Sequence, residues 1–146
     1  MFQNAAAELG VTNPHWVHRD FQSQNILVRG EQVYLIDFQG MRRGHREYDL
    51  ASLIYDPYMN HSPERQQRLV DLWQEVSADT LNPEKLRFCA MQRLMQSLGA
   101  YGNIFYNQGI SWYGEQIAPA VSLLKKVIED SIFEPILLPL LQRCES

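Results

Sequence analysis

The chain has 146 residues, and 13 basic against 17 acidic side chains give it a net charge of −4 and a pI of about 5.5. This acidic balance argues against a protein that coats nucleic acid, because phosphate binding depends on clustered lysine and arginine. A hydrophobic share of 45% argues against intrinsic disorder, and no apolar run is long enough to cross a membrane.

Neither the first residues nor the two cysteines predict a targeting segment or a metal site. The first residues, Met1 to Ala5, lack a basic stretch followed by an apolar one, so no signal peptide is expected. Cys89 and Cys144 lie far apart without CxxC spacing, which leaves zinc and thioredoxin chemistry unsupported. Free thiols suit a reducing compartment, and we expect a cytoplasmic protein.

The first third of the chain predicts a small amount of β-structure. Residues 2–9 favour a short helix, and a polar loop precedes residue 26. Two short β-branched runs at 26–28 and 33–36 flank a glycine-containing turn and predict a hairpin. A basic loop is expected over 41–46.

From residue 47 onward the apolar spacing is helical. The chain is therefore expected to be mainly α with a small β-hairpin, in a single domain, 1–146. The predicted helix signals are a stop at Asp56-Pro57, starts at Ser62-Pro63-Glu64 and Asn82-Pro83-Glu84, a stop at Gly109, a start at Ala118-Pro119, and breaks at Pro135 and Pro139.

Three oxygen-bearing side chains flank the predicted hairpin. Asp20 and Asn25 precede its first strand, and Asp37 follows its second. Because a hairpin brings its two ends together, we expect the three to converge, and two carboxylates with one amide oxygen suit Mg²⁺. Asp20 could then orient or deprotonate an attacking hydroxyl. Taken singly, such residues are more often turn formers, and metal-dependent hydrolysis without a nucleotide is a further alternative.

The order of these motifs resembles the catalytic half of the protein-kinase-like fold. The chain carries HRDFQSQNILV at 18–28 and LIDFQ at 35–39. A glutamine in place of the glycine of protein kinases looks more like the small-molecule branch, the aminoglycoside phosphotransferases and choline kinases. YDLASL at 48–53 and Gln92-Arg93 look most similar to bacterial N-acetylmuramate/N-acetylglucosamine kinases.

The resemblance implies a role for each matching residue. Asp20 would be the catalytic base, and Asn25 and Asp37 would bind Mg²⁺ and, through it, the phosphates of ATP or another nucleoside triphosphate. Leu27 and Ile36 would form the floor of the adenine pocket. The segments implied are a catalytic loop at 18–25, a hairpin at 26–36, a metal loop at 37–40 and a helical subdomain at 47–146.

Further residues keep two interpretations. The resemblance implies that His18 braces the catalytic loop and that Asp49 holds its backbone, although a purely structural role is the simpler explanation for either residue alone. Arg42, Arg43, His45 and Arg46 could meet a phosphate or an anionic substrate, and a solvated loop is the slightly favoured alternative. An aromatic group could line an acceptor cleft or serve helix packing equally well: Tyr101, Phe105, Tyr106, Trp112 and Tyr113.

The resemblance covers only the C-terminal, catalytic lobe of that fold, and the N-terminal lobe is expected to be absent. Only 17 residues precede His18, and every lysine lies in the helical region. The expected activity is ATP-dependent phosphorylation of a sugar or amino-sugar hydroxyl, with the isolated chain incomplete and inactive or weakly active. The alternative is a pseudokinase-like helical module that pairs with another protein. In either case we expect the interlobe face to be exposed and apolar, and to bind a second copy or an N-lobe partner.

Overall fold

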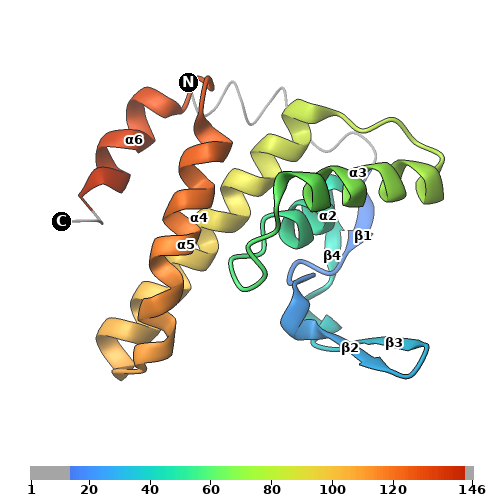
Figure 1. The fold of residues 1–146 in the computed structure, drawn as a ribbon, viewed down its shortest axis with the longest axis horizontal. Helices are drawn as coiled ribbons and strands as arrows, with labels where there is room; N and C mark the ends of the chain where they lie inside the picture. Colours follow the sequence, from blue (N-terminus) through green and yellow to red (C-terminus); the bar gives the residue numbers. More distant parts are fainter. Residues whose placement is uncertain (1–13, 144–146) are drawn as a thin grey trace.

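The computed structural model describes residues 14–143, which form two small antiparallel sheets and a set of helices (Figure 1). The helix expected over 2–9 lies outside the described residues. The strands are β1 (His15–Val17), β2 (Ile26–Arg29), β3 (Gln32–Leu35) and β4 (Arg42–Gly44), with short 3₁₀ turns η1 (Ser23–Asn25) and η2 (Phe38–Gly40). The helices are α2 (Glu47–Ile54), α3 (Pro63–Ser77), α4 (Pro83–Gln108), α5 (Ser111–Ile128) and α6 (Glu134–Gln142).

The predicted hairpin is confirmed as the pair β2–β3. Ile26 lies opposite Leu35, and Arg29 opposite Gln32, so the turn consists of Gly30 and Glu31. Gly30 has a φ of +61°, a left-handed conformation that glycine adopts without a Cβ penalty. The ribbon extends away from the helices (Figure 1), which leaves both of its faces largely open.

A second ribbon joins β1 to β4, and it corrects the prediction of a loop over 41–46. Trp16 pairs with Arg43, and Val17 with Arg42. Each strand has only three residues, and the partners lie far apart in the sequence. The sequence of either segment alone does not predict this pairing, because each strand is stabilised by its partner strand rather than by an alternating pattern of its own.

The predicted helix starts are confirmed by their capping contacts. The Ser62 hydroxyl accepts a hydrogen bond from the Arg65 backbone N–H at 3.4 Å, and the Asn82 side chain accepts one from Lys85 at 3.0 Å. These oxygens satisfy backbone donors that the first helical turn leaves unpaired. The predicted helix stop at Gly109 is also confirmed. Gly109 follows the last residue of α4 and has a φ of +70°, the left-handed conformation that glycine often adopts after a helix.

The expectations for the later prolines were wrong. Pro119 does not open a helix, since α5 begins at Ser111 and continues through it. Pro135 lies in the first turn of α6, and Pro139 lies inside that helix rather than ending it. A proline inside a helix removes one backbone hydrogen bond, and the burial of α5 against α4 offsets that loss here.

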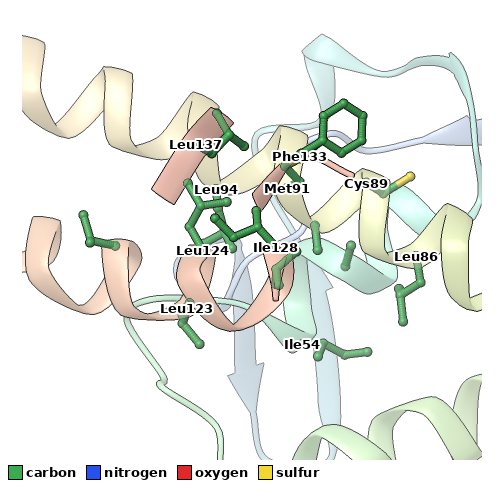
Figure 2. Packing of buried hydrophobic residues seen from close by; sticks show 14 of the residues in the cluster. Ile54, Leu86, Cys89, Met91, Leu94, Leu123, Leu124, Ile128, Phe133 and Leu137 are labelled. Atoms are coloured by element: carbon green, nitrogen blue, oxygen red, sulfur yellow. The ribbon is translucent and has the colours of Figure 1, made fainter. Parts of the chain in front are cut away.

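The hydrophobic core lies where α2, α4 and α5 meet, and α6 closes one side of it (Figure 2). Ile54, Leu94 and Leu124 are almost completely buried there. Burial of this kind fixes α2 against the longer helices, and α2 in turn carries Asp49 and leads into Asp56. Among the described helices, none has the length and apolar character needed to span a membrane.

Candidate active site

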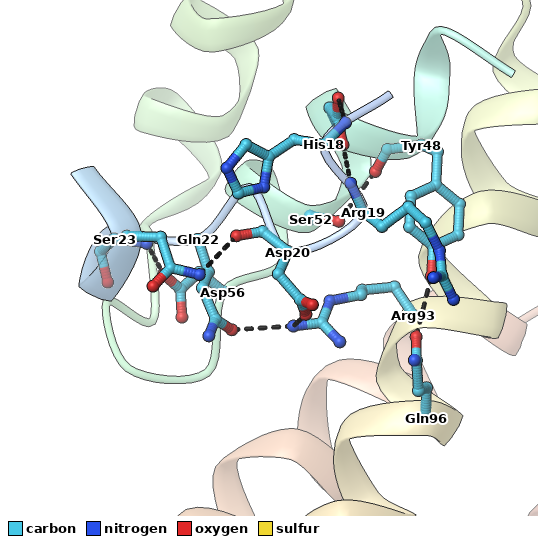
Figure 3. Close-up of polar contacts among 12 residues, drawn as sticks. His18, Arg19, Asp20, Gln22, Ser23, Tyr48, Ser52, Asp56, Arg93 and Gln96 are labelled. Carbon is cyan, nitrogen blue, oxygen red and sulfur yellow. Dashed lines mark hydrogen bonds and ion pairs between the residues drawn. The ribbon is translucent and has the colours of Figure 1, made fainter. Parts of the chain in front are cut away.

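Two carboxylates hold the backbone of the predicted catalytic loop. Asp49 accepts hydrogen bonds from the backbone N–H groups of His18 at 2.6 Å and Arg19 at 2.9 Å. Asp56, which is 1% exposed, accepts one from the Ser23 N–H at 2.7 Å (Figure 3). The loop is therefore anchored at two points, to Asp49 within α2 and to Asp56, two residues after α2 ends. Sequence reasoning treated Asp56 only as a helix stop and missed this contact.

His18 connects this loop to the end of the hairpin. Its side chain is buried, and its Nε2 donates a hydrogen bond to the Ile36 carbonyl at 2.9 Å. The contacts that the sequence analysis expects of His18 and Asp49 are thus present. Burial raises the pKa of Asp49, and the two backbone donors oppose that rise without overcoming it.

The Asp20 side chain is held by an arginine from α4. Arg93 Nη2 lies 3.0 Å from Asp20 Oδ1 and 2.8 Å from the Gln22 side-chain oxygen (Figure 3). One guanidinium therefore contacts two side chains of the loop. The Arg93 side chain is only 10% exposed, whereas that of Asp20 is 44% exposed. A buried cation requires an anionic partner, and Asp20 meets that requirement while still facing solvent.

Arg93 entered the sequence analysis only as part of a resemblance, with no role assigned to it. A local signal for it exists, because it falls on the buried side of α4 beside Ala90, Leu94 and Ser97. An arginine among core positions indicates a charged partner elsewhere in the fold. Nothing in the sequence says that the partner is Asp20.

The backbone brings Asn25 and Asp37 to the same end of the hairpin as Asp20. The Asn25 amide donates to the Asp20 carbonyl at 2.9 Å, and the Asn25 carbonyl accepts from the Ile36 N–H at 3.1 Å. Asp37 follows directly, with a φ of +63°, and its Oδ1 accepts from the Gln39 side chain at 2.6 Å. A left-handed aspartate is uncommon, and such strained residues concentrate at functional sites.

The donor set at this end of the hairpin fits a hard divalent cation. Within residues 14–143, no hydrogen bond engages the side-chain oxygen of Asn25 or the second carboxylate oxygen of Asp37. The described residues contain no cluster of three or more His, Cys, Asp or Glu side chains suited to a metal. A cation here would therefore have few protein ligands, the usual arrangement for Mg²⁺ bound together with phosphates and water.

Leu27 and Ile36 lie on the hairpin and are 48% and 41% exposed. Several other large apolar side chains of the hairpin and of the turn after it are exposed as well. We call this set the hairpin patch: Leu27, Val28, Val33, Tyr34, Leu35, Ile36 and Phe38. The adenine contact expected of Leu27 and Ile36 stays a prediction, since the described residues supply only one side of such a pocket.

The basic cluster divides into two parts. Arg46 forms ion pairs with Asp79 and Glu47 and lies over the Trp73 ring, so its charge is taken up within the helical region. Arg42 and Arg43 instead lie on β4. For these two, the expectation of an irregular loop is replaced by a strand with a fixed direction.

The aromatic group defined in the sequence analysis packs against other aromatic side chains. Trp112 stacks on Tyr58 with ring centroids 5.3 Å apart, and Tyr101 lies 5.9 Å from Tyr113. Tyr106 contacts Phe105 edge-on and is otherwise exposed. These contacts join α4, α5 and the segment after α2, as the helix-packing interpretation expects.

Comparisons with known proteins identify the family of this chain. Over 121 residues the chain is 27% identical to an N-acetylmuramate/N-acetylglucosamine kinase of Neisseria meningitidis serogroup B, a match that covers 77% of this chain and 36% of that protein. The chain thus spans about a third of the length of this curated relative. The model of the phosphotransferase enzyme family matches residues 2–89, which include the catalytic loop, the hairpin and α2. Because this match extends over more than half of its 146 residues, the chain belongs to the phosphotransferase enzyme family.

Proposed function

We propose that this protein transfers a phosphoryl group from ATP to the hydroxyl of a sugar or amino sugar. One observation carries the proposal above all others: a solvent-facing carboxylate, Asp20, is held by the buried Arg93, and its backbone carbonyl accepts from the Asn25 side chain. Phosphoryl transfer depends almost entirely on positioning and charge stabilisation, so a loop held this firmly suits the reaction. Membership of the phosphotransferase enzyme family supports the same conclusion.

In this proposal each side chain has one task. Asp20 orients the acceptor hydroxyl and takes its proton as the oxygen attacks the terminal phosphorus, while the bond from that phosphorus to the bridging oxygen breaks and ADP leaves. Arg93 keeps the Asp20 carboxylate in a single direction. Asn25 and Asp37 would hold Mg²⁺, which neutralises the charge of the ATP phosphates when bound. Asp49 keeps the loop backbone in register with α2.

An amino-sugar acceptor is supported by the relative from Neisseria meningitidis, whose name gives N-acetylmuramate and N-acetylglucosamine as its substrates. The charge near the site agrees with an acceptor of this type. Arg42 and Arg43 follow the candidate metal loop closely, and their charge disfavours a polycationic acceptor such as an aminoglycoside. We also propose that this chain is the C-terminal lobe of a protein-kinase-like fold and that the protein is cytoplasmic.

The hairpin patch is the surface through which we propose that this protein binds a second copy or an N-terminal lobe. Its apolar side chains are exposed on both faces of the ribbon, and exposed apolar surface of this kind marks association sites. A covering surface would also complete the adenine pocket beside Leu27 and Ile36. Light scattering over a wide concentration range tests self-association directly, and a strict monomer contradicts the second-copy form.

The decisive experiment measures nucleotide binding by isothermal titration calorimetry. ATP should bind in the presence of Mg²⁺, more weakly after the metal is removed with EDTA, and not measurably to Asp37→Ala. Asp71→Ala is the matched control, because it removes an exposed carboxylate on α3 that lies outside the site. Equal binding by Asp37→Ala and wild type would contradict the proposed metal site.

The acceptor needs a second experiment on protein that binds nucleotide. A panel of N-acetylmuramate, N-acetylglucosamine, choline and an aminoglycoside is offered with ATP, and formation of ADP is measured. We expect turnover with the amino sugars, and none with either variant that lacks Asp20 or Asp37. Turnover confined to choline or the aminoglycoside would contradict the acceptor assignment.

A further inference from the structure

A cavity of about 360 Å³ lies beside the catalytic loop, between the β1–β4 ribbon and α4. The side chains that give it its chemistry are Arg19, Arg42, Arg43, His45, Gln92 and Gln96. Figure 3 shows Arg19, Tyr48 and Gln96 next to one another at its wall. The candidate catalytic and metal residues Asp20, Asn25 and Asp37 are not among the residues that line it.

The cavity gathers positive charge in a protein that is negative overall. Three arginines, Arg19, Arg42 and Arg43, are among its lining residues, and none of its described lining residues is acidic. Within residues 14–143, no ion pair engages any of the three, and Arg19 Nη1 donates only to the Gly40 carbonyl at 3.5 Å. Like charges held around one cavity repel one another, so an anion between them lowers the electrostatic energy.

The neutral groups of the wall are arranged as donors. The Tyr48 hydroxyl donates a hydrogen bond to the Gln96 side-chain oxygen at 2.9 Å, which leaves the Gln96 NH₂ group free to donate. Burial raises the pKa of Tyr48, so its hydroxyl keeps its proton at neutral pH. The cavity therefore offers hydrogen-bond donors beside its cations, as an oxyanion requires.

The guanidinium of Arg43 has its contacts outside the cavity. It lies 5.0 Å from the centre of the Trp16 ring and donates to the Pro14 carbonyl at 2.9 Å. Neither Trp16 nor Pro14 is among the lining residues, so Arg19 and Arg42 are the arginines left to meet an anion. Pairing of β4 with β1 keeps the backbone of Arg42 fixed.

We propose that this cavity binds the phosphate group of a small phosphate monoester. Two guanidinium groups favour a dianion over a monoanion, and each matches phosphate oxygens with paired hydrogen bonds. The cavity volume falls at the lower end of the range for small-molecule sites, which suits a phosphate with a short organic part. The site is separate from the nucleotide site proposed above, although Arg19 directly precedes Asp20 and joins the two.

The test titrates the 146-residue chain with inorganic phosphate and with glycerol 3-phosphate, without nucleotide or added metal. Both should bind, the monoester at least as tightly as phosphate. Arg42→Gln should weaken both at least tenfold. The matched control Arg29→Gln, an exposed strand arginine outside the cavity, should bind as wild type does.

Asp37→Ala distinguishes this site from the nucleotide site, and it should bind phosphate normally even if it loses ATP. Loss of phosphate binding in Asp37→Ala, with binding retained in Arg42→Gln, overturns the proposal. So does glycerol 3-phosphate failing to bind, or malonate binding more tightly than either phosphate, since a carboxylate site is then indicated. If Arg42→Gln melts well below wild type, Gln92→Glu replaces it, because a carboxylate at this exposed position of α4 should repel the same ligand.

Discussion

The helical region and the β2–β3 hairpin differ in how far their apolar side chains are exposed to solvent. Ile54 and Leu94 are 1% and 0% exposed in the core, whereas Val28 and Val33 on the hairpin are 70% and 63% exposed. The hairpin is held instead by polar contacts of the loop that precedes it, from Asp49 and from Arg93. Stability thus resides mainly in the helices, and the candidate site is built on a thin ribbon anchored to them.

The largest expected effect tests this contrast directly. Leu94→Ala should lower the free energy of unfolding by about 3 kcal/mol, because it leaves a cavity in the core. Val33→Ala should change it by less than about 0.5 kcal/mol, since Val33 is already in contact with water. Urea unfolding followed by circular dichroism measures both values. Similar losses for the two variants would show that the hairpin is buried against another surface.

Removal of a loop anchor should have the next largest effect. Asp49→Ala leaves the N–H groups of His18 and Arg19 without their acceptor, and we expect a loss of about 2 kcal/mol in the free energy of unfolding. The matched control is Asp71→Ala, an exposed aspartate on α3, which should change the value by less than about 0.5 kcal/mol.

The pH dependence of this effect has a definite sign. Burial raises the pKa of Asp49 above its ordinary value of 3.8, so the native state binds the Asp49 proton more tightly than the unfolded chain does. The contribution of Asp49 to stability is therefore full below that ordinary value and declines as pH rises through the folded pKa. The difference between wild type and Asp49→Ala should be larger at pH 4 than at pH 7. The reverse trend would show that the backbone donors, not burial, dominate.

A smaller effect is expected from the pair that orients Asp20. A double-mutant cycle with Arg93→Met and Asp20→Asn should give a coupling energy of about 1 kcal/mol, because Asp20 is half exposed and its charge is partly screened. The cycle is measured by urea unfolding in low salt. Coupling below about 0.3 kcal/mol would mean that Arg93 does not hold the carboxylate in solution.

The smallest effect on stability is expected on the hairpin patch. Val33→Lys should leave the free energy of unfolding within about 0.5 kcal/mol of wild type, since the side chain reaches water. If the patch binds a second copy, the same change should reduce the average mass measured by light scattering at high concentration. Glu31→Gln, in the hairpin turn, raises the net charge by the same one unit and should leave association intact.

Local sequence signals predicted much of this protein. Ser62 and Asn82 cap their helices because their side chains reach N–H groups three residues away. The hairpin followed from two short apolar runs around Gly30, and its closure is enough to bring Asn25 next to Ile36 and hence to Asp37. These features depend on neighbours a few residues apart, which is the range over which sequence patterns carry information.

The tertiary structure alone decided the remaining features. The pairing of β1 with β4, the contact between Arg93 and Asp20, and the continuation of α5 through Pro119 all depend on segments that meet only after folding. The basic cluster of the sequence was divided in the same way, with Arg46 paired to Asp79 while Arg42 and Arg43 line a cavity with Arg19. The sequence gives the charge of each side chain, but the packing of distant elements determines which partner that side chain contacts.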